Sequence, residues 1–217
     1  MKGIFVTGNG TGIGKTVVSA ILVKALNADY WKPLQAGSLD CTDRATVANL
    51  TSPTNSVIHQ ETYVLGTFAS PHEGSQKEQV EIDFSRLTLL PKANRPLIVE
   101  GVGGIMSPIS AEHLNLDFIK KISFPTLIVS RTYLGSINHT LMTIEILKQN
   151  QIPILGLIFN GDRNSYSEDF ITKYSTVANL GFIPTRRSID ASWIQEQAFS
   201  VQEAVDRAFT QFWSSCA

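Results

Sequence analysis

The sequence predicts an α/β fold in which a parallel sheet is flanked by helices. Short β-branched runs typical of strands buried on both faces occur at residues 4–7, 96–100, 126–130 and 154–160. Segments with helical period lie between or after them, at residues 17–26, 137–150 and 166–180. This alternation favours right-handed crossovers that place helices on both faces of one sheet.

The segments that follow the strands form the candidate site, because ligands of parallel sheets bind outside the carboxyl ends of the strands. These segments are residues 8–16, 100–104, 131–136 and 160–162. A shorter strand-like run, residues 28–31, leads directly to Lys32.

Two further stretches complete the organisation. Residues 50–79 are rich in Ser, Thr, His and Gln and show no clear period, so we expect them to cover the rim of the site and not to build the sheet. Residues 201–213 place apolar side chains at helical spacing, which predicts an amphipathic helix that closes the fold.

Composition favours one cytoplasmic domain that acts on small molecules. A length of 217 residues suits a single α/β domain over residues 1–217. The net charge is −1 and the 18 basic residues are scattered, which argues against nucleic acid or a membrane surface as partners. Cys41 and Cys216 are too few for a disulfide framework. No apolar run approaches the roughly 20 residues of a membrane span, and we see no signal-peptide pattern.

A glycine-rich loop links the first strand to the first helix. It reads Gly-Asn-Gly-Thr-Gly-Ile-Gly-Lys-Thr over residues 8–16. Glycines let backbone N–H groups turn toward a phosphate, and the helix N-terminus adds partial positive charge. Lys15 would bridge the β- and γ-phosphates, and Thr16 would ligate Mg²⁺. The loop therefore predicts a P-loop NTPase of Rossmann-like three-layer architecture that uses MgATP. The alternative is a glycine-rich turn before an ordinary helix.

Four later segments, taken with the spacing of this loop, make a family resemblance specific. Five residues separate Gly8 from Gly14, one more than in the standard P-loop pattern. The later segments are Lys-Pro-Leu-Gln-Ala-Gly at 32–37 with Thr-Asp at 42–43, Val-Glu-Gly-Val-Gly-Gly at 99–104, Leu-Gly-Ser-Ile-Asn-His at 134–139, and Phe-Asn at 159–160 with Gly-Phe-Ile-Pro at 181–184. Together they resemble the dethiobiotin synthetases over most of the chain, from Gly3 to about Pro184.

The resemblance implies a reaction of biotin biosynthesis. In that family 7,8-diaminopelargonate, CO₂ and MgATP give dethiobiotin, ADP and phosphate. One amine captures CO₂ as a carbamate, the γ-phosphate moves to a carbamate oxygen, and the second amine closes the ring. The resemblance also implies a homodimer whose active sites are shared between the two chains.

The resemblance assigns roles to individual residues. Lys15 and Lys32 would be catalytic, and Lys32 would hold the carbamate and the transferred phosphoryl group. The metal ligands would be Thr16, Asp43 and Glu100. The nucleotide would contact Gly12, Ile13, Gly14, Lys15, Thr16, Val17, Asp43, Glu100, Gly101, Val102, Gly103, Asn160, Gly161, Pro184, Thr185 and Arg186. The diamine substrate would contact Thr11, Lys32, Ala36, Gly135, Ser136, Ile137 and Asn138.

Plainer interpretations stay open for several of these residues. Lys32 could be a solvated surface lysine. Asp43 and Ser136 could each cap a helix, and Asn160 could be a turn residue. Glu100 is different, because a carboxylate at the end of a buried strand would be costly to bury without a partner.

Some positions depart from the family pattern, and two other functions compete. Ala36 stands where the family usually has Ser or Thr, and His72 in a Ser-Pro-His segment could either line the diamine pocket or serve as a capping or turn residue.

One competing function is that of another P-loop amidoligase or cobyrinate-type synthase, although the chain lacks room for a glutaminase domain. The other is a regulatory P-loop ATPase of the partitioning type, whose second lysine is replaced here by Gly10.

Overall fold

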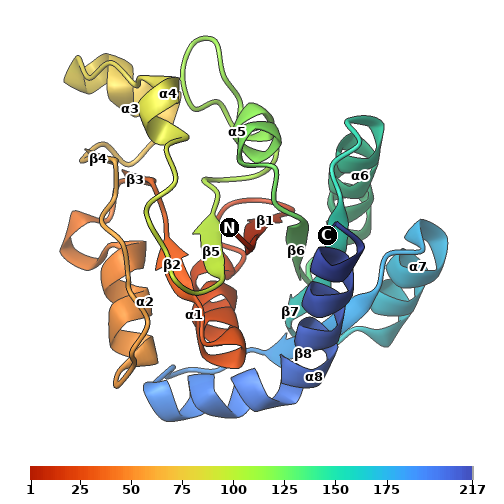
Figure 1. The fold of residues 1–217 in the computed structure, drawn as a ribbon. Coiled ribbons are helices and arrows are strands. Elements are labelled where there is room, and N and C mark those ends of the chain that lie inside the picture. The colour runs from red at the N-terminus through yellow and green to blue at the C-terminus, as the bar shows by residue number, and fades with distance from the viewer. Residues whose placement is uncertain (217) are drawn as a thin grey trace.

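The computed structural model describes residues 1–216, and a parallel sheet lies at its centre (Figure 1). Within these residues six strands form that sheet in the order β2-β5-β1-β6-β7-β8. Their bounds are Gly3–Gly8 (β1), Asp29–Trp31 (β2), Leu97–Glu100 (β5), Thr126–Arg131 (β6), Ile154–Gly161 (β7) and Asn179–Pro184 (β8). All neighbouring pairs are parallel. The predicted parallel sheet is confirmed.

Helices cover both faces of the sheet and make the predicted three layers. One hydrophobic cluster joins the sheet to α1 (Lys15–Leu26), α2 (Asp43–Thr51) and α8 (Ala191–Ser215). A second cluster joins the opposite face to α5 (Asn115–Ile122), α6 (Ser136–Gln149) and α7 (Ser165–Ser175). Within residues 1–216 no helix has both the length and the apolar character that crossing a membrane requires.

A smaller substructure lies beyond the β2 edge of the sheet (Figure 1). Two short parallel strands, β3 (Leu34–Ala36) and β4 (Tyr63–Leu65), pair with each other there. They are accompanied by the short helices η1 (Leu39–Cys41), α3 (Pro71–Glu78) and α4 (Phe84–Leu87). Residues 50–79 add no strand to the central sheet, as predicted, although Ile58 forms a single bridge to Tyr30 of β2. They also contain β4 and α3, which the sequence pattern did not indicate.

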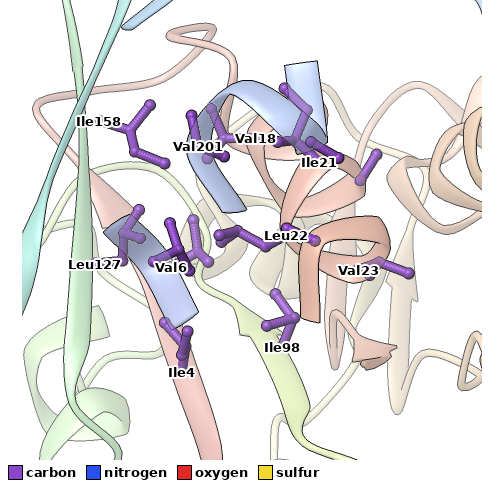
Figure 2. Close-up of a cluster of buried hydrophobic side chains, with 14 of the residues drawn as sticks. Ile4, Val6, Val18, Ile21, Leu22, Val23, Ile98, Leu127, Ile158 and Val201 are labelled. Carbon is purple, nitrogen blue, oxygen red and sulfur yellow. The ribbon is translucent and has the colours of Figure 1, made fainter. Parts of the chain in front are cut away.

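The core is built on the alternation of side chains along β1 (Figure 2). Ile4 and Val6 point toward α1 and meet Leu22, while Val201 of α8 lies over the same cluster. Phe5 points to the opposite face, where its ring packs edge to face against Phe118 of α5 with the ring centroids 5.2 Å apart. Burial of such side chains contributes about 1.5–3 kcal/mol each. Packing on both faces fixes β1 and so fixes where its following loop begins.

The predicted helix over residues 166–180 is wrong at its C-terminal end. Helix α7 ends at Ser175, and Thr176 adopts a left-handed conformation with φ of 57° as its C-cap. The chain then forms β8, in which Leu180 and Ile183 are buried. Apolar residues there continue the helical spacing by coincidence, but their burial against β7 and α8 favours a strand. The closing helix is also longer than predicted, because Asp190 caps it ten residues earlier.

Candidate functional site

The glycine loop leads straight into α1, as its motif predicts. Gly14 is the N-cap of this helix with a φ of 92° and provides no capping side chain, so the first N–H groups of the helix are open to a ligand. Gly14 also lacks space for a side chain, because an added Cβ would lie 2.2 Å from the amide nitrogen of Asn160. The backbone at Gly14 thus presents open N–H groups of the kind that bind phosphate.

Lys15 is buried at the start of α1 and turns back over the loop. Its Nζ donates to the carbonyl oxygen of Gly10 at 2.8 Å. Burial lowers the pKa of Lys15 to about 8, although the nearby Glu100 carboxylate acts in the opposite direction. A buried ammonium with one neutral acceptor can readily gain from a polyanionic partner.

Four charged or hydroxyl side chains converge beside this loop. The Thr16 hydroxyl lies 2.6 Å from Asp43 Oδ1 and 3.1 Å from Glu100 Oε1. Lys32 Nζ pairs with Asp43 Oδ2 and lies 3.3 Å from Glu100 Oε1. The four groups come from different parts of the chain: Thr16 lies in α1, Lys32 directly follows β2, Asp43 begins α2 and Glu100 ends β5. Lys32, Glu100 and the glycine loop meet at the carboxyl ends of the parallel strands, as the sequence predicts.

The buried position of Lys32 excludes a solvated surface lysine. The residue follows β2 and is only 7% exposed. Burial favours its neutral form, but the carboxylates of Glu100 and Asp43 outweigh this effect and raise the pKa of Lys32 above its ordinary value. Lys32 is therefore a fixed positive charge at neutral pH.

Asp43 is not a helix cap. Thr42 occupies the N-cap of α2, and its side chain accepts a hydrogen bond from Ala45 N. Burial acts to raise the pKa of Asp43, yet the neighbouring Lys32 ammonium lowers it below its ordinary value. The backbone N–H of Asp43 donates to Gln35 Oε1 at 3.2 Å. The Asp43 carboxylate is thereby free to face the cluster.

The oxygen donors of this cluster fit Mg²⁺. Thr16, Asp43 and Glu100 bring together a hydroxyl and two carboxylates, whose cluster-facing oxygens accept hydrogen bonds from Thr16 itself and from Lys32, and such hard oxygens suit a divalent cation. Residues 1–216 contain no group of three or more His, Cys, Asp or Glu side chains placed to hold a metal. Mg²⁺ suits such a site because it binds through one or two carboxylates together with phosphate oxygens and water.

A cavity of about 470 Å³ opens on the cluster. Its lining includes three predicted substrate residues, Thr11, Lys32 and Ala36, and also residues 68–71. Residues 50–79 thus contribute to the rim, as predicted. His72 lines a different groove, where its ring contacts Gln76, and Ser70 is the N-cap of α3. His72 therefore neither caps α3 nor lines the cavity beside Lys32.

The remaining predicted substrate residues lie at the start of α6. Gly135 is the N-cap of this helix, with a φ of 97° and no capping side chain, and Ser136 is the first helical residue. Ser136 is therefore not the cap. The residues that line the cavity beside Lys32 do not include any of residues 135–138. The fold of one chain separates the two halves of the predicted substrate site.

The predicted nucleotide contacts at residues 160–161 and 184–186 meet at the other end of the sheet. Gly161 of β7 pairs with Pro184 of β8, and Thr185 N donates to the Gly161 carbonyl at 3.1 Å. The Asn160 amide donates to the carbonyl oxygen of Ile13 at 2.7 Å, which ties β7 to the glycine loop. Arg186 lies over the ring of Trp193 at 5.8 Å. The structure gathers these groups along one exposed edge.

The remaining predicted nucleotide contacts also lie near the glycine loop. Val102 and Gly103 line the same cavity as Gly12, Ile13, Gly14, Lys15 and Thr16. Gly101 is buried behind them, and Val17 follows Thr16 in α1.

Two buried polar residues of the site, Ser19 and Tyr30, were missed by sequence reasoning, and both contact Glu100. Ser19 was detectable, because it lies three residues after Thr16 and so shares its helix face. Tyr30 sits in a short strand-like run, where nothing in the pattern distinguishes a polar contact from core packing. Gln35, which lies in the quoted motif at residues 32–37, contacts Asp43.

The chain is similar to known proteins over most of its length. A family model described as an AAA domain matches residues 2–192. The ATP-dependent dethiobiotin synthetase BioD of Paramagnetospirillum magneticum is 43% identical over 194 residues, which cover 89% of this chain and 93% of that protein. The protein of the same name from Christiangramia forsetii is 41% identical and covers 91% of this chain and 94% of its own length.

Solved structures support the fold. The MinC:MinD cell division protein complex of Aquifex aeolicus superposes with a TM-score of 0.56 at 13% identity, covering 99% of this chain and 96% of that chain. The septum site-determining protein MinD of Pyrococcus horikoshii, complexed with Mg-ADP, superposes with a TM-score of 0.52 at 14% identity. This match covers 96% of this chain and 95% of that chain. At these identities the likeness concerns the fold alone, and it confirms the P-loop NTPase architecture.

Proposed function

The chain belongs to the ATP-dependent dethiobiotin synthetase family, and from this membership we propose that it converts 7,8-diaminopelargonate, CO₂ and MgATP to dethiobiotin, ADP and phosphate. The observation that carries the proposal is the placement of Lys32. Its ammonium is held by Asp43 and Glu100 at the mouth of the phosphate loop, beside the Thr16 hydroxyl. A fixed cation there suits an intermediate that gains negative charge.

The glycine loop and Lys15 would bind the triphosphate. The open N–H groups at the start of α1 and the buried ammonium both favour negative charge. Thr16, Asp43 and Glu100 would hold Mg²⁺, which neutralises phosphate charge and aligns the terminal phosphate for in-line transfer.

Lys32 would act as an electrostatic group and not as a base. Its pKa is raised by the two carboxylates, so at neutral pH it has no free electron pair for a proton. When a carbamate forms, Lys32 can exchange part of its pairing with Asp43 for the new anion. The substrate amines would have to arrive neutral to act as nucleophiles.

The chemistry balances without a protein nucleophile. The first amine forms a C–N bond to CO₂ and loses a proton, which gives the carbamate. A carbamate oxygen then bonds to the γ-phosphorus as the bond to ADP breaks. The second amine attacks the carbonyl carbon, phosphate leaves and a second proton is released. Positioning and charge neutralisation are therefore the tasks left to the protein.

We further propose that the active enzyme is a homodimer with shared sites. Residues 135–138 and Lys32 do not line the same cavity, yet a long diamine acid has its amines and its carboxylate at opposite ends. The open N-terminus of α6 suits a carboxylate. A second chain could offer this helix start to the cavity of the first.

A substrate-omission assay tests the proposed reaction. Phosphate release should require 7,8-diaminopelargonate and bicarbonate together, and either omission should reduce it to background. Dethiobiotin should appear in equal amount to phosphate, as measured by mass spectrometry. Phosphate release without the diamine would instead favour a regulatory ATPase.

Mixed dimers test the shared site. Lys32→Ala and Ser136→Glu should each be inactive alone, the second because it places negative charge where the carboxylate should bind. In a mixed dimer one site carries both defects and the other carries neither. Mixing under conditions that demonstrably exchange subunits should restore part of the activity, and no recovery would place the whole site within one chain.

A further inference from the structure

We propose that Ser19 and Tyr30 are positioning residues that orient the Glu100 carboxylate toward its metal and Lys32. Glu100 is 1% exposed, and its two oxygens have different partners. Oε2 accepts hydrogen bonds from Ser19 Oγ at 2.8 Å and from Tyr30 OH at 2.9 Å. Oε1 faces the Thr16 hydroxyl and Lys32 Nζ.

The two donors come from different elements and are themselves fixed. Ser19 lies on α1, one turn after Thr16, and Tyr30 lies on β2, next to β5 in the sheet. Both residues are completely buried. The Tyr30 ring packs in the hydrophobic cluster of α1, so its hydroxyl has little freedom to move away from Glu100.

This arrangement breaks the symmetry of a carboxylate. A free carboxylate can rotate and present either oxygen, or both, to a ligand. Two hydroxyl donors on Oε2 hold one orientation, and the other oxygen is then presented to the cavity. Because the donors are neutral, they satisfy Oε2 without cancelling the charge of Glu100, which remains available for Lys32 or a cation.

The inference rests on the proposed metal role of Glu100, but it does not depend on the identity of the organic substrate. Tyr30→Phe removes the hydroxyl and keeps the ring, so packing is largely preserved. The matched control is Tyr63→Phe, which removes a hydroxyl that accepts a hydrogen bond from Asp83 N in a groove that none of the cluster residues line.

The experiment measures how Mg²⁺ tightens ADP binding. Calorimetric titrations of ADP at a series of Mg²⁺ concentrations give the Mg²⁺ midpoint of this tightening. We expect Tyr30→Phe and Ser19→Ala to raise the midpoint on the order of 10-fold, with ADP affinity in EDTA unchanged. Ser19→Thr, which keeps the hydroxyl, should restore most of the wild-type midpoint.

Coupling to Glu100 distinguishes positioning from general stability. If Tyr30 acts through Glu100, Tyr30→Phe should shift the midpoint no further in a Glu100→Gln background. A purely structural role would lower Tm and leave the midpoint where it is. Unchanged midpoints in both single variants, additive effects in the double variant, or a Glu100→Gln variant with the wild-type midpoint would each overturn the inference. None of these measurements uses the diamine, so failure of the turnover assay remains a separate result.

Discussion

At the carboxyl edge of the sheet, β2, β5 and β1 lead into a buried cluster of paired charges, whereas β7 and β8 lead into exposed groups with few contacts. In the cluster, Lys32 and Glu100 are almost inaccessible, and each has more than one polar partner. At the other end Pro184, Thr185 and Arg186 are all exposed.

The difference between the two ends of the sheet indicates where side chains must be held in fixed positions. Groups that act on a reacting phosphate must hold their positions, and buried networks of hydrogen bonds provide this rigidity. The predicted nucleotide contacts at the β7–β8 end would need only to add affinity, so exposed contacts would suffice there. We therefore expect substitutions in the buried cluster to affect turnover and those at the β7–β8 end to affect binding weakly.

The largest expected effect separates the two buried lysines. Lys32→Ala should lower kcat by roughly 10²–10³-fold, a loss comparable to that of an electrostatic group acting on the transition state, with little change in ADP affinity. Lys15→Ala should reduce both kcat and the affinity for ADP, because the Lys15 ammonium contacts the glycine loop itself. Steady-state kinetics and calorimetry provide the two readouts.

Lys24→Ala is the control for these two variants. Lys24 lies on α1, as Lys15 does, but it donates to Pro53 O and does not line the cavity. It should keep wild-type kinetics. Wild-type turnover by Lys32→Ala would remove this residue from the mechanism and with it the sharpest contrast between the two ends of the sheet.

Asp43→Asn should have the next largest effect. It keeps the shape of the side chain but removes one of the two carboxylate charges beside Thr16. We expect the Mg²⁺ concentration for half-maximal activity to rise on the order of 10-fold. Asp40→Asn, an exposed neighbour in η1, should leave the Mg²⁺ dependence unaltered. An identical Mg²⁺ profile for Asp43→Asn would exclude it as a ligand.

Asn160→Ala tests the link between the two ends. The Asn160 amide donates to Ile13 O in the glycine loop, and a hydrogen bond of this kind contributes about 1 kcal/mol. We expect the KM for ATP to rise about fivefold at that energy, with kcat within twofold of wild type. Asp162→Ala, at an exposed position two residues along the chain, serves as the control. A large loss of kcat in Asn160→Ala would instead show that β7 positions the catalytic loop.

The smallest expected effect is that of Arg186→Ala. Arg186 is exposed, and its contact is the ring of Trp193. Exposed contacts of this type contribute about 0.5–1 kcal/mol, so the KM for ATP should change by about two- to fivefold at most. Steady-state kinetics at varied ATP would check this, and a tenfold change would mean that the exposed end recognises the nucleotide as strictly as the cluster does.

The sequence by itself determined the sheet, the phosphate loop and most of the site. β-branched runs end in glycine or polar residues, and this local pattern predicts both the strands and the edge where ligands bind. The same pattern placed Lys15, Thr16 and Glu100 at one edge, because parallel strands all end there, whereas the role of Asp43 came from the family resemblance. These conclusions need only the period and order of residues along the chain.

Tertiary structure alone decided what surrounds those residues. Only the fold shows that Thr42, and not Asp43, caps α2, that Lys32 is buried between two carboxylates, and that Ser19 and Tyr30 hold the far oxygen of Glu100. It also showed that residues 179 and 180, at the end of the helix predicted over residues 166–180, belong to β8. Such outcomes depend on burial and on contacts between residues distant in sequence, and local periodicity carries no information about either.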